Sequence, residues 1–162
     1  MKGRSQSGYQ QNRIYLNNGS GHFQDVAKFV CASEAFDGRA VAFADLWNRG
    51  VLDVIVANQN SRLEIYRNQT TPSNHWIAFE LEGIRNNRSA IGATLDLYWN
   101  DQNQLQVITG GIGFCAQNQR RVHYGIGTAS GVDSMVIRWP NGIKQVILHA
   151  DINVVNKILE SR

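Results

Sequence analysis

The sequence has few of the residues that mark a disulfide scaffold, a proline-rich segment or a membrane protein. Only 2 of its 162 residues are cysteine, and only 2 are proline. No apolar run approaches the roughly 18 residues that a membrane-spanning helix requires. We therefore expect no transmembrane helix and no insertion into a membrane. The basic start at Met1–Gln6 has no apolar stretch after it, so we expect no secretory signal in this chain.

Charged residues are also scarce, at 18% of the chain, and much of the polar character comes from 16 Asn and 12 Gln. The net charge of +3 and the pI of about 9.1 raise nucleic acid as a partner. The arginines, however, are scattered, and no basic stripe with interleaved aromatic residues occurs. We therefore expect no nucleic-acid partner. Hydrophobic residues make up 43%, which is enough for a packed core and too many for a disordered chain.

The two cysteines, Cys31 and Cys115, are too far apart in sequence for a CxxC or zinc-ligand motif. Each has apolar neighbours, as in Phe29-Val30-Cys31 and Gly113-Phe114-Cys115. This setting predicts two buried thiols, and a single disulfide between them is the alternative. The sequence alone does not decide between these redox states.

What the sequence does contain is a series of short segments with β composition, separated by turns rich in Gly, Asn and Asp. Apolar residues alternate clearly in Ala93–Tyr98, and the turn Pro140–Gly142 between two apolar segments is a hairpin signal. Only Lys28–Phe36 has a composition that also allows one short helical turn. The predicted strands cover residues 13–17, 22–26, 39–44, 53–58, 63–67, 75–82, 93–99, 104–109, 121–124, 134–139, 144–148 and 153–159. The fold class is therefore all-β with little or no helix.

A stretch near residue 70 contains the first proline of the chain and divides the strands into two groups. The polar residues 1–11 predict a flexible lead-in. We expect a first β region over 12–69, a linker over 70–74 and a second β domain over 75–160.

A loop that begins at Asp45 has the skeleton of a calcium-binding loop, D-x-D-x-D-G-x-x-D, between two strands. Gly50 and Asp53 match this pattern, whereas Trp47 and Arg49 stand where the second and third acids belong. An arginine offers no lone pair, and its positive charge would lie close to the ion. The sequence therefore favours a loop that keeps the bend without the metal, in which Arg49 pairs with Asp45 or Asp53.

The same loop has two other interpretations. Asn48 offers a carbonyl oxygen, so a calcium ion held by Asp45, Asn48 and Asp53 is the alternative to a metal-free loop. Trp47 stands at the position of a ligand acid, which predicts an exposed side chain in contact with a partner or a ligand. A sugar-binding, lectin-like site would be formed by Trp47, Asn48 and Asp45. The other three tryptophans are expected to pack in the core.

A family resemblance rests on several motifs that occur in a fixed order. The run from Asn12 to Gln69 resembles an FG-GAP (VCBS-type) β-propeller repeat, the kind also found in integrin alpha chains. Its matching segments are Asn12–Gly19, Phe23–Val26, Gly38–Asp45, Asp53–Asn58 and Ile65–Asn68. The remainder, roughly residues 74–159, resembles an ASPIC/UnbV domain. Its matching segments are Asn74–Trp76, Asn87–Ala93, Gly110–Phe114, His123–Gly127 and Ile137–Gly142.

The resemblance implies a propeller-blade-like antiparallel sheet followed by a small β-sandwich or barrel-like domain, with 12–69 forming one blade or part of two. It also implies an extracellular or periplasmic location, which the sequence itself leaves unknown, and no established enzyme activity. We expect a non-enzymatic binding or interaction module, such as the C-terminal part of a longer propeller protein, with a protein or glycan partner. Because a lone blade leaves unpaired edges, we expect it to pack on the second domain or to pair with another copy.

The alternative is an enzyme or enzyme accessory with a pocket between the blade and the second domain. Loops around Arg88, Gly110–Phe114 and the pair Arg120-Arg121 would line this pocket. The candidate ligand or interface residues are Trp47, Arg49, Arg88, Arg120 and Arg121. The sequence contains no nucleophile elbow, phosphate-binding loop or dinucleotide motif in a suitable context, so we predict no catalytic residue and no cofactor.

Overall fold

The computed structural model describes residues 8, 10–70 and 73–161. The predicted all-β fold class is confirmed, because these residues form 12 strands and no helix. The strands make four sheets, none of which closes into a barrel. Within the described ranges there is accordingly no helix that could cross a membrane. Most of the predicted lead-in and residues 71–72 of the predicted linker lie outside the described residues.

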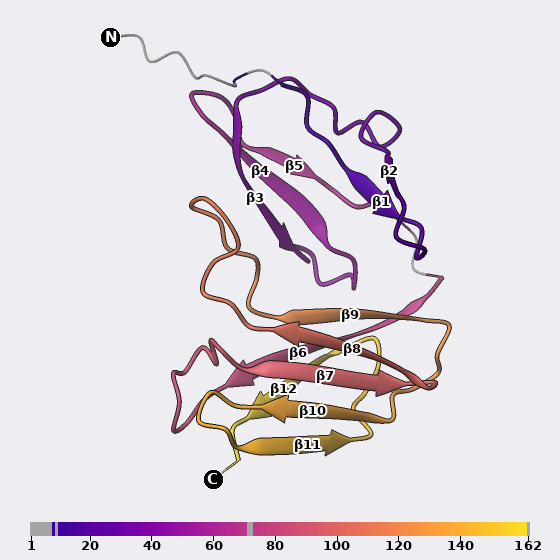
Figure 1. The fold of residues 1–162 in the computed structure, drawn as a ribbon, viewed down its shortest axis with the longest axis vertical. Helices are drawn as coiled ribbons and strands as arrows, with labels where there is room; N and C mark the ends of the chain where they lie inside the picture. The colour runs from indigo at the N-terminus through magenta and orange to yellow at the C-terminus, as the bar shows by residue number, and fades with distance from the viewer. Residues whose placement is uncertain (1–7, 9, 71–72, 162) are drawn as a thin grey trace.

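The N-terminal region, residues 12–69, contains five strands in two small antiparallel sheets (Figure 1). One sheet is the hairpin of β1 (Tyr15–Asn17) and β2 (Phe23–Asp25). The other contains β3 (Gly38–Ala44), β4 (Asp53–Asn58) and β5 (Glu64–Tyr66) in that order. The region therefore consists of a two-stranded and a three-stranded antiparallel sheet, which is consistent with the expected blade-like architecture.

The segment between β2 and β3 forms a turn and no helix. The N–H groups of Phe29 and Val30 both donate to the carbonyl oxygen of Val26, at 2.9 and 3.2 Å. The Ala32 N–H donates to the carbonyl of Ala27 at 2.9 Å, and both alanines are buried. The segment whose composition also allows a short helical turn thus contains a hydrogen-bonded turn instead.

The C-terminal domain, residues 75–160, begins with the central strand of its first sheet. β6 (His75–Glu82) pairs antiparallel with β9 (Val122–Gly127) and parallel with β12 (Val155–Leu159). The chain therefore closes the domain by placing its last strand beside the first one.

The second sheet of this domain has four antiparallel strands in the order β11-β10-β7-β8. These strands are β7 (Thr94–Trp99), β8 (Gln102–Val107), β10 (Ser134–Arg138) and β11 (Lys144–Leu148). The predicted hairpin at Pro140–Gly142 joins β10 to β11, and the Gly142 N–H donates to the carbonyl of Trp139 at 2.8 Å.

One hydrophobic core lies between these two sheets, which makes the domain a sandwich. Burial alternates along β7, β9 and β10, as the period of two requires. The side chains with 0% exposure that form its centre are Ile77, Phe79, Leu95, Leu97, Tyr124, Met135 and Ile137. Trp99 and Trp139 are buried beside them, as expected, whereas Trp76 is only partly buried and does not belong to this core.

The prediction of buried thiols is wrong. Cys31 and Cys115 are exposed and free, so they form no disulfide either. Both residues have positive φ angles, 54° and 52°, in tight turns. Their neighbours Phe29 and Phe114 are 80% and 75% exposed. The apolar residues that suggested burial therefore belong to surface turns, and the core is formed elsewhere.

Candidate functional site

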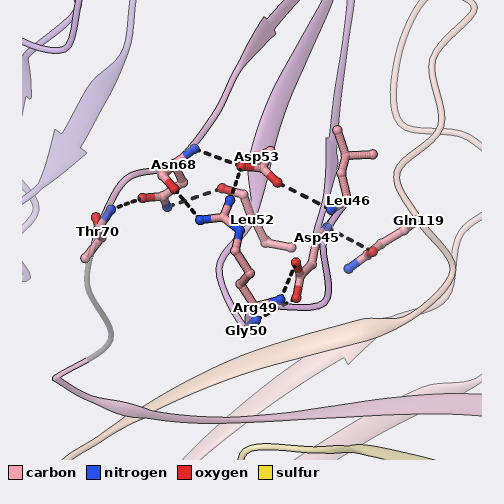
Figure 2. Close-up of polar contacts among 9 residues, drawn as sticks. All are labelled: Asp45, Leu46, Arg49, Gly50, Leu52, Asp53, Asn68, Thr70 and Gln119. Atoms are coloured by element: carbon pink, nitrogen blue, oxygen red, sulfur yellow. Dashed lines mark hydrogen bonds and ion pairs between the residues drawn. The ribbon is translucent and has the colours of Figure 1, made fainter.

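The loop from Asp45 to Asp53 is held closed by its own carboxylates (Figure 2). Asp45 is 6% exposed, and its two oxygens accept the N–H groups of Arg49 and Gly50 at 2.8 and 2.6 Å. The N–H of Asp45 in turn donates to Oε1 of Gln119 at 3.1 Å. The first acid of the pattern therefore fixes the loop backbone.

The guanidinium of Arg49 supplies the positive charge beside the last acid. Its Nη2 pairs with Oδ1 of the fully buried Asp53 at 2.8 Å, and its Nη1 donates to the carbonyl of Asn68 at 2.8 Å. Asp53 also accepts the N–H groups of Asn68 and Leu46, at 2.8 and 3.3 Å. The predicted pairing of Arg49 is thus present, and its partner is Asp53.

These residues do not fit a calcium ion. Calcium takes about six to eight oxygen ligands, whereas the oxygens of Asp45 and Asp53 already accept loop N–H groups and a guanidinium. Oδ1 of Asn48, the third predicted ligand, accepts from Nη1 of Arg121 at 2.7 Å and so faces the C-terminal domain. In the described part of the chain, no three His, Cys, Asp or Glu side chains come together as a metal site. The loop contains an internal ion pair instead.

Trp47 is 47% exposed and lies next to two cations. The guanidinium carbons of Arg49 and Arg67 lie 5.3 and 5.0 Å from the centroid of its ring. Such cation–π contacts use the aromatic surface that a sugar would stack on. Within the chain the ring of Trp47 contacts two arginines, and its contact with a partner or a ligand stays a prediction.

The tip of the loop packs directly against the C-terminal domain. A Cβ on Gly50, whose φ is +78°, would lie 2.0 Å from Nε1 of Trp76. Trp76 stacks on His123 with ring centroids 5.7 Å apart and an interplanar angle of 12°. Nε2 of His123 lies 2.9 Å from the carbonyl oxygen of Gly50, so this nitrogen carries the hydrogen of the contact. Only a glycine allows this approach.

Residues 117–121, between β8 and β9, cover the end of β3 (Figure 1). Oδ1 of Asn118 accepts the N–H of Phe43 at 2.8 Å, and the Gln119 N–H donates to the carbonyl of Phe43 at 3.1 Å. The Asp45 N–H also donates to the side chain of Gln119. These three hydrogen bonds satisfy backbone groups at the end of β3 as a neighbouring strand would. The N-terminal region therefore packs on the C-terminal domain, one of the two arrangements expected for its edge.

Two family models match separate parts of the chain. A family model described as an FG-GAP-like repeat matches residues 5–56, and one described as ASPIC and UnbV matches residues 83–162. The chain is an FG-GAP-like repeat followed by an ASPIC/UnbV domain. The resemblance inferred from the sequence motifs is confirmed. The second match begins just after β6, although β6 is the central strand of the domain's first sheet.

One similar protein is cartilage acidic protein 1 from Mus musculus. It is 27% identical over 128 residues, which cover 75% of this chain and 20% of that protein. The chain thus spans about a fifth of the length of this relative.

The FG-GAP-like repeat and the ASPIC/UnbV domain enclose a pocket of about 230 Å³, which we call the interdomain pocket. Phe43 and Leu52 line it from the repeat, and Ile112 lines it from the loop expected to do so. Arg88 does not line it, because this residue pairs with Glu82 at 2.9 Å beside another groove. The nitrogen-bearing lining residues are Gln106, Asn118, Gln119, Arg120, Arg121 and His123.

Sequence reasoning missed four residues that join the two parts. Trp76 and His123 were not connected to the loop, and Asn118 and Gln119 resemble ordinary turn residues in the sequence. The available signal was a loop that keeps the glycine of the calcium-loop pattern but has Trp47 and Arg49 at two of the acid positions.

Proposed function

We propose that this protein is a non-enzymatic interaction module of extracellular type, in which the FG-GAP-like repeat binds a protein partner. The observation that supports it is a groove of about 470 Å³ between the β1–β2 hairpin and the β3–β5 sheet. Most of its exposed surface is apolar, and its larger lining side chains include Tyr15, Val41, Phe43, Val54 and Tyr66. An open apolar surface of this kind favours contact with another polypeptide.

The distribution of buried residues supports the same proposal. Among the described residues, the buried hydrophobic side chains of the repeat are only Ala27, Ala32 and Val56, and all others lie in the ASPIC/UnbV domain. In contrast, 11 of the 22 exposed large hydrophobic side chains in this same part of the chain lie in the repeat. The repeat therefore has very little core of its own, and a partner that covers its groove would supply the missing apolar contacts.

The free edge of the repeat sheet provides a second means of contact. In the described residues β5 pairs with β4 alone, so its other side has no neighbouring strand. Exposed edges of this kind pair readily with a strand from another chain. A second copy of this protein is therefore a partner that can be tested directly, through the edge and groove of the repeat.

A protein partner fits better than a glycan. The ring of Trp47, the first candidate for sugar stacking, already contacts the guanidinium groups of Arg49 and Arg67. Asn48 and Asp45, the other two candidates, are engaged by Arg121 and by loop N–H groups. Loss of glycan-array binding on Trp47→Ala would favour the glycan instead.

Light scattering behind size exclusion tests the proposal with two matched variants. Val41 and Val146 are strand residues with similar exposure, 42% and 48%, but only Val41 lines the groove. We expect the wild type and Val146→Asp to gain mass above 18.2 kDa with concentration, and Val41→Asp to remain monomeric. A wild-type mass of 18.2 kDa at every concentration would exclude a second copy as the partner.

A further inference from the structure

The interdomain pocket is rich in hydrogen-bond donors and lacks acids. Its lining contains two arginines, one histidine and three amide side chains, but no aspartate or glutamate. Arg120 and Arg121 also have no carboxylate within 4.0 Å among the described residues, whereas Arg13, Arg49 and Arg88 each have one. Positive charge is therefore concentrated in a concave site without an internal counterion.

The amide groups of the pocket are fixed in orientation by the repeat. Oδ1 of Asn118 and Oε1 of Gln119 must accept, because the backbone N–H groups of Phe43 and Asp45 point at them. Both side-chain NH₂ groups are consequently donors directed elsewhere. Nε2 of Gln119 is buried and has no acceptor among the described residues. A buried donor without a partner is costly, and because Gln119 lines the pocket, an acceptor that enters against this residue and reaches Nε2 would remove that cost.

The two arginines are held in place without using up their donors. Nη1 of Arg121 donates to Asn48 at 2.7 Å, and Nη1 of Arg120 donates to the hydroxyl of Ser89 at 2.5 Å. A guanidinium has five N–H groups, so further donors remain on both residues. Planar guanidinium groups suit the oxygens of carboxylates, sulfates and phosphates.

We propose that the interdomain pocket binds a small oxyanion, a carboxylate, sulfate or phosphate group, through Gln119 and Arg121. This site shares only Phe43 with the lining of the apolar groove, and its occupation does not require the proposed protein partner. Because residues from both parts line the pocket, a bound oxyanion also strengthens the contact between the repeat and the ASPIC/UnbV domain. The ligand is either a free inorganic anion or the acidic group of a sugar.

Two substitutions test the proposed contacts, and each has a matched control at an exposed position outside the pocket. Gln119→Glu keeps the oxygen that accepts the Asp45 N–H and replaces the buried donor Nε2 by a carboxylate oxygen. Gln104→Glu makes the same change in charge at an exposed position on β8 outside the pocket. Arg121→Gln removes the guanidinium, and Arg138→Gln removes one from an exposed position on β10 outside the pocket.

The full chain is titrated with sodium sulfate, sodium phosphate and sodium glucuronate, with sodium chloride at equal ionic strength as the reference. We expect saturable binding and a higher melting temperature than in chloride, with NMR shifts in the Gln119 side-chain amide and in Arg121 Nε. Gln119→Glu and Arg121→Gln should each lose about tenfold or more in affinity, while both control variants bind as the wild type does.

Binding of the inorganic anions alone, or of glucuronate as well, supports the proposal and identifies the source of the oxyanion. The proposal is overturned if the wild type binds none of the three probes. It is also overturned if Gln119→Glu binds the oxyanions as tightly as Gln104→Glu does. The same holds if the NMR shifts on titration spread over the Nε signals of all arginines. A failure of Arg121→Gln to fold leaves the wild-type titration and Gln119→Glu to decide.

Discussion

Arg49 differs from the other paired arginines of the described chain in how deeply its acid is buried. The Asp53 side chain is fully buried, and the Arg49 side chain is 25% exposed. In contrast, Arg88 and Glu82 are 86% and 50% exposed. Exposed pairs contribute little because water and salt screen them. A buried carboxylate without its cation is strongly unfavourable, so the stability of the loop depends on Arg49.

Arg49→Ala is expected to lower the free energy of unfolding by about 3 kcal/mol, because it leaves Asp53 buried without a counterion. Arg88→Ala, which breaks an exposed pair, should cost less than about 1 kcal/mol. Urea denaturation followed by circular dichroism measures both. Equal losses in the two variants would show that Arg49 contributes no more than a surface charge.

At the scale of elements, the sequence located most strands closely, and the deviations have local causes. The predicted strands 53–58, 75–82 and 144–148 coincide with β4, β6 and β11. β8 begins two residues before its predicted start, because Asn100 and Asp101 both adopt positive φ, 47° and 59°. They form a two-residue hairpin that allows Gln102 to pair with Trp99 at once. Because this turn contains no glycine, its residues did not mark the position of the hairpin strongly.

The contact between the loop and β6 depends on a missing side chain, which predicts an unequal effect of two glycine substitutions. Gly50 and Gly19 have similar φ angles, +78° and +82°, but only a Cβ on Gly50 would meet another atom, Nε1 of Trp76 at 2.0 Å. Both Ala variants carry the backbone strain of about 1 kcal/mol. Gly50→Ala should cost about 1–3 kcal/mol more through overpacking.

Thermal unfolding compares the two glycine variants, and tryptophan fluorescence reports the surroundings of Trp76 directly. We expect a changed emission spectrum in Gly50→Ala and a spectrum like the wild type in Gly19→Ala. Equal melting temperatures for both variants would mean that the loop does not pack tightly on β6.

At the scale of the whole molecule, the two parts are stabilised in different ways. The ASPIC/UnbV domain has a closed core between two sheets, whereas the repeat depends on contacts from residues 117–121 and Trp76. The end of the chain completes the domain through Glu160, which is 2% exposed. Its carboxylate accepts hydrogen bonds from the segment after β6 and from the turn between β10 and β11.

This carboxylate gives the stability of the protein a predicted dependence on pH. Burial alone would raise the pKa of Glu160, but the N–H groups of Ile84, Arg85 and Asn86 and the amide of Asn141 lower it below the ordinary value of 4.5. A carboxyl whose pKa is lower in the folded state stabilises the fold above its unfolded pKa. This contribution is lost as the pH falls through the folded value.

Melting temperatures of the wild type and Glu160→Gln, measured from neutral to acidic pH, test this dependence. The wild type should be more stable at neutral pH, and its advantage should shrink as the pH falls below 4.5. An advantage that stays constant across this range would mean that the ionised carboxylate contributes nothing specific.

The sequence by itself determined the all-β class, most strand positions and both family assignments. These features depend on alternation, turn residues and local spacing, which are properties of neighbouring residues. Only the tertiary structure decided that Cys31 and Cys115 are exposed, that Asp53 is the partner of Arg49 and that Arg88 lies outside the interdomain pocket. It also brought Gln119 to Asp45, 74 residues away in the chain. Such contacts depend on how whole sheets pack, and no local pattern encodes that packing.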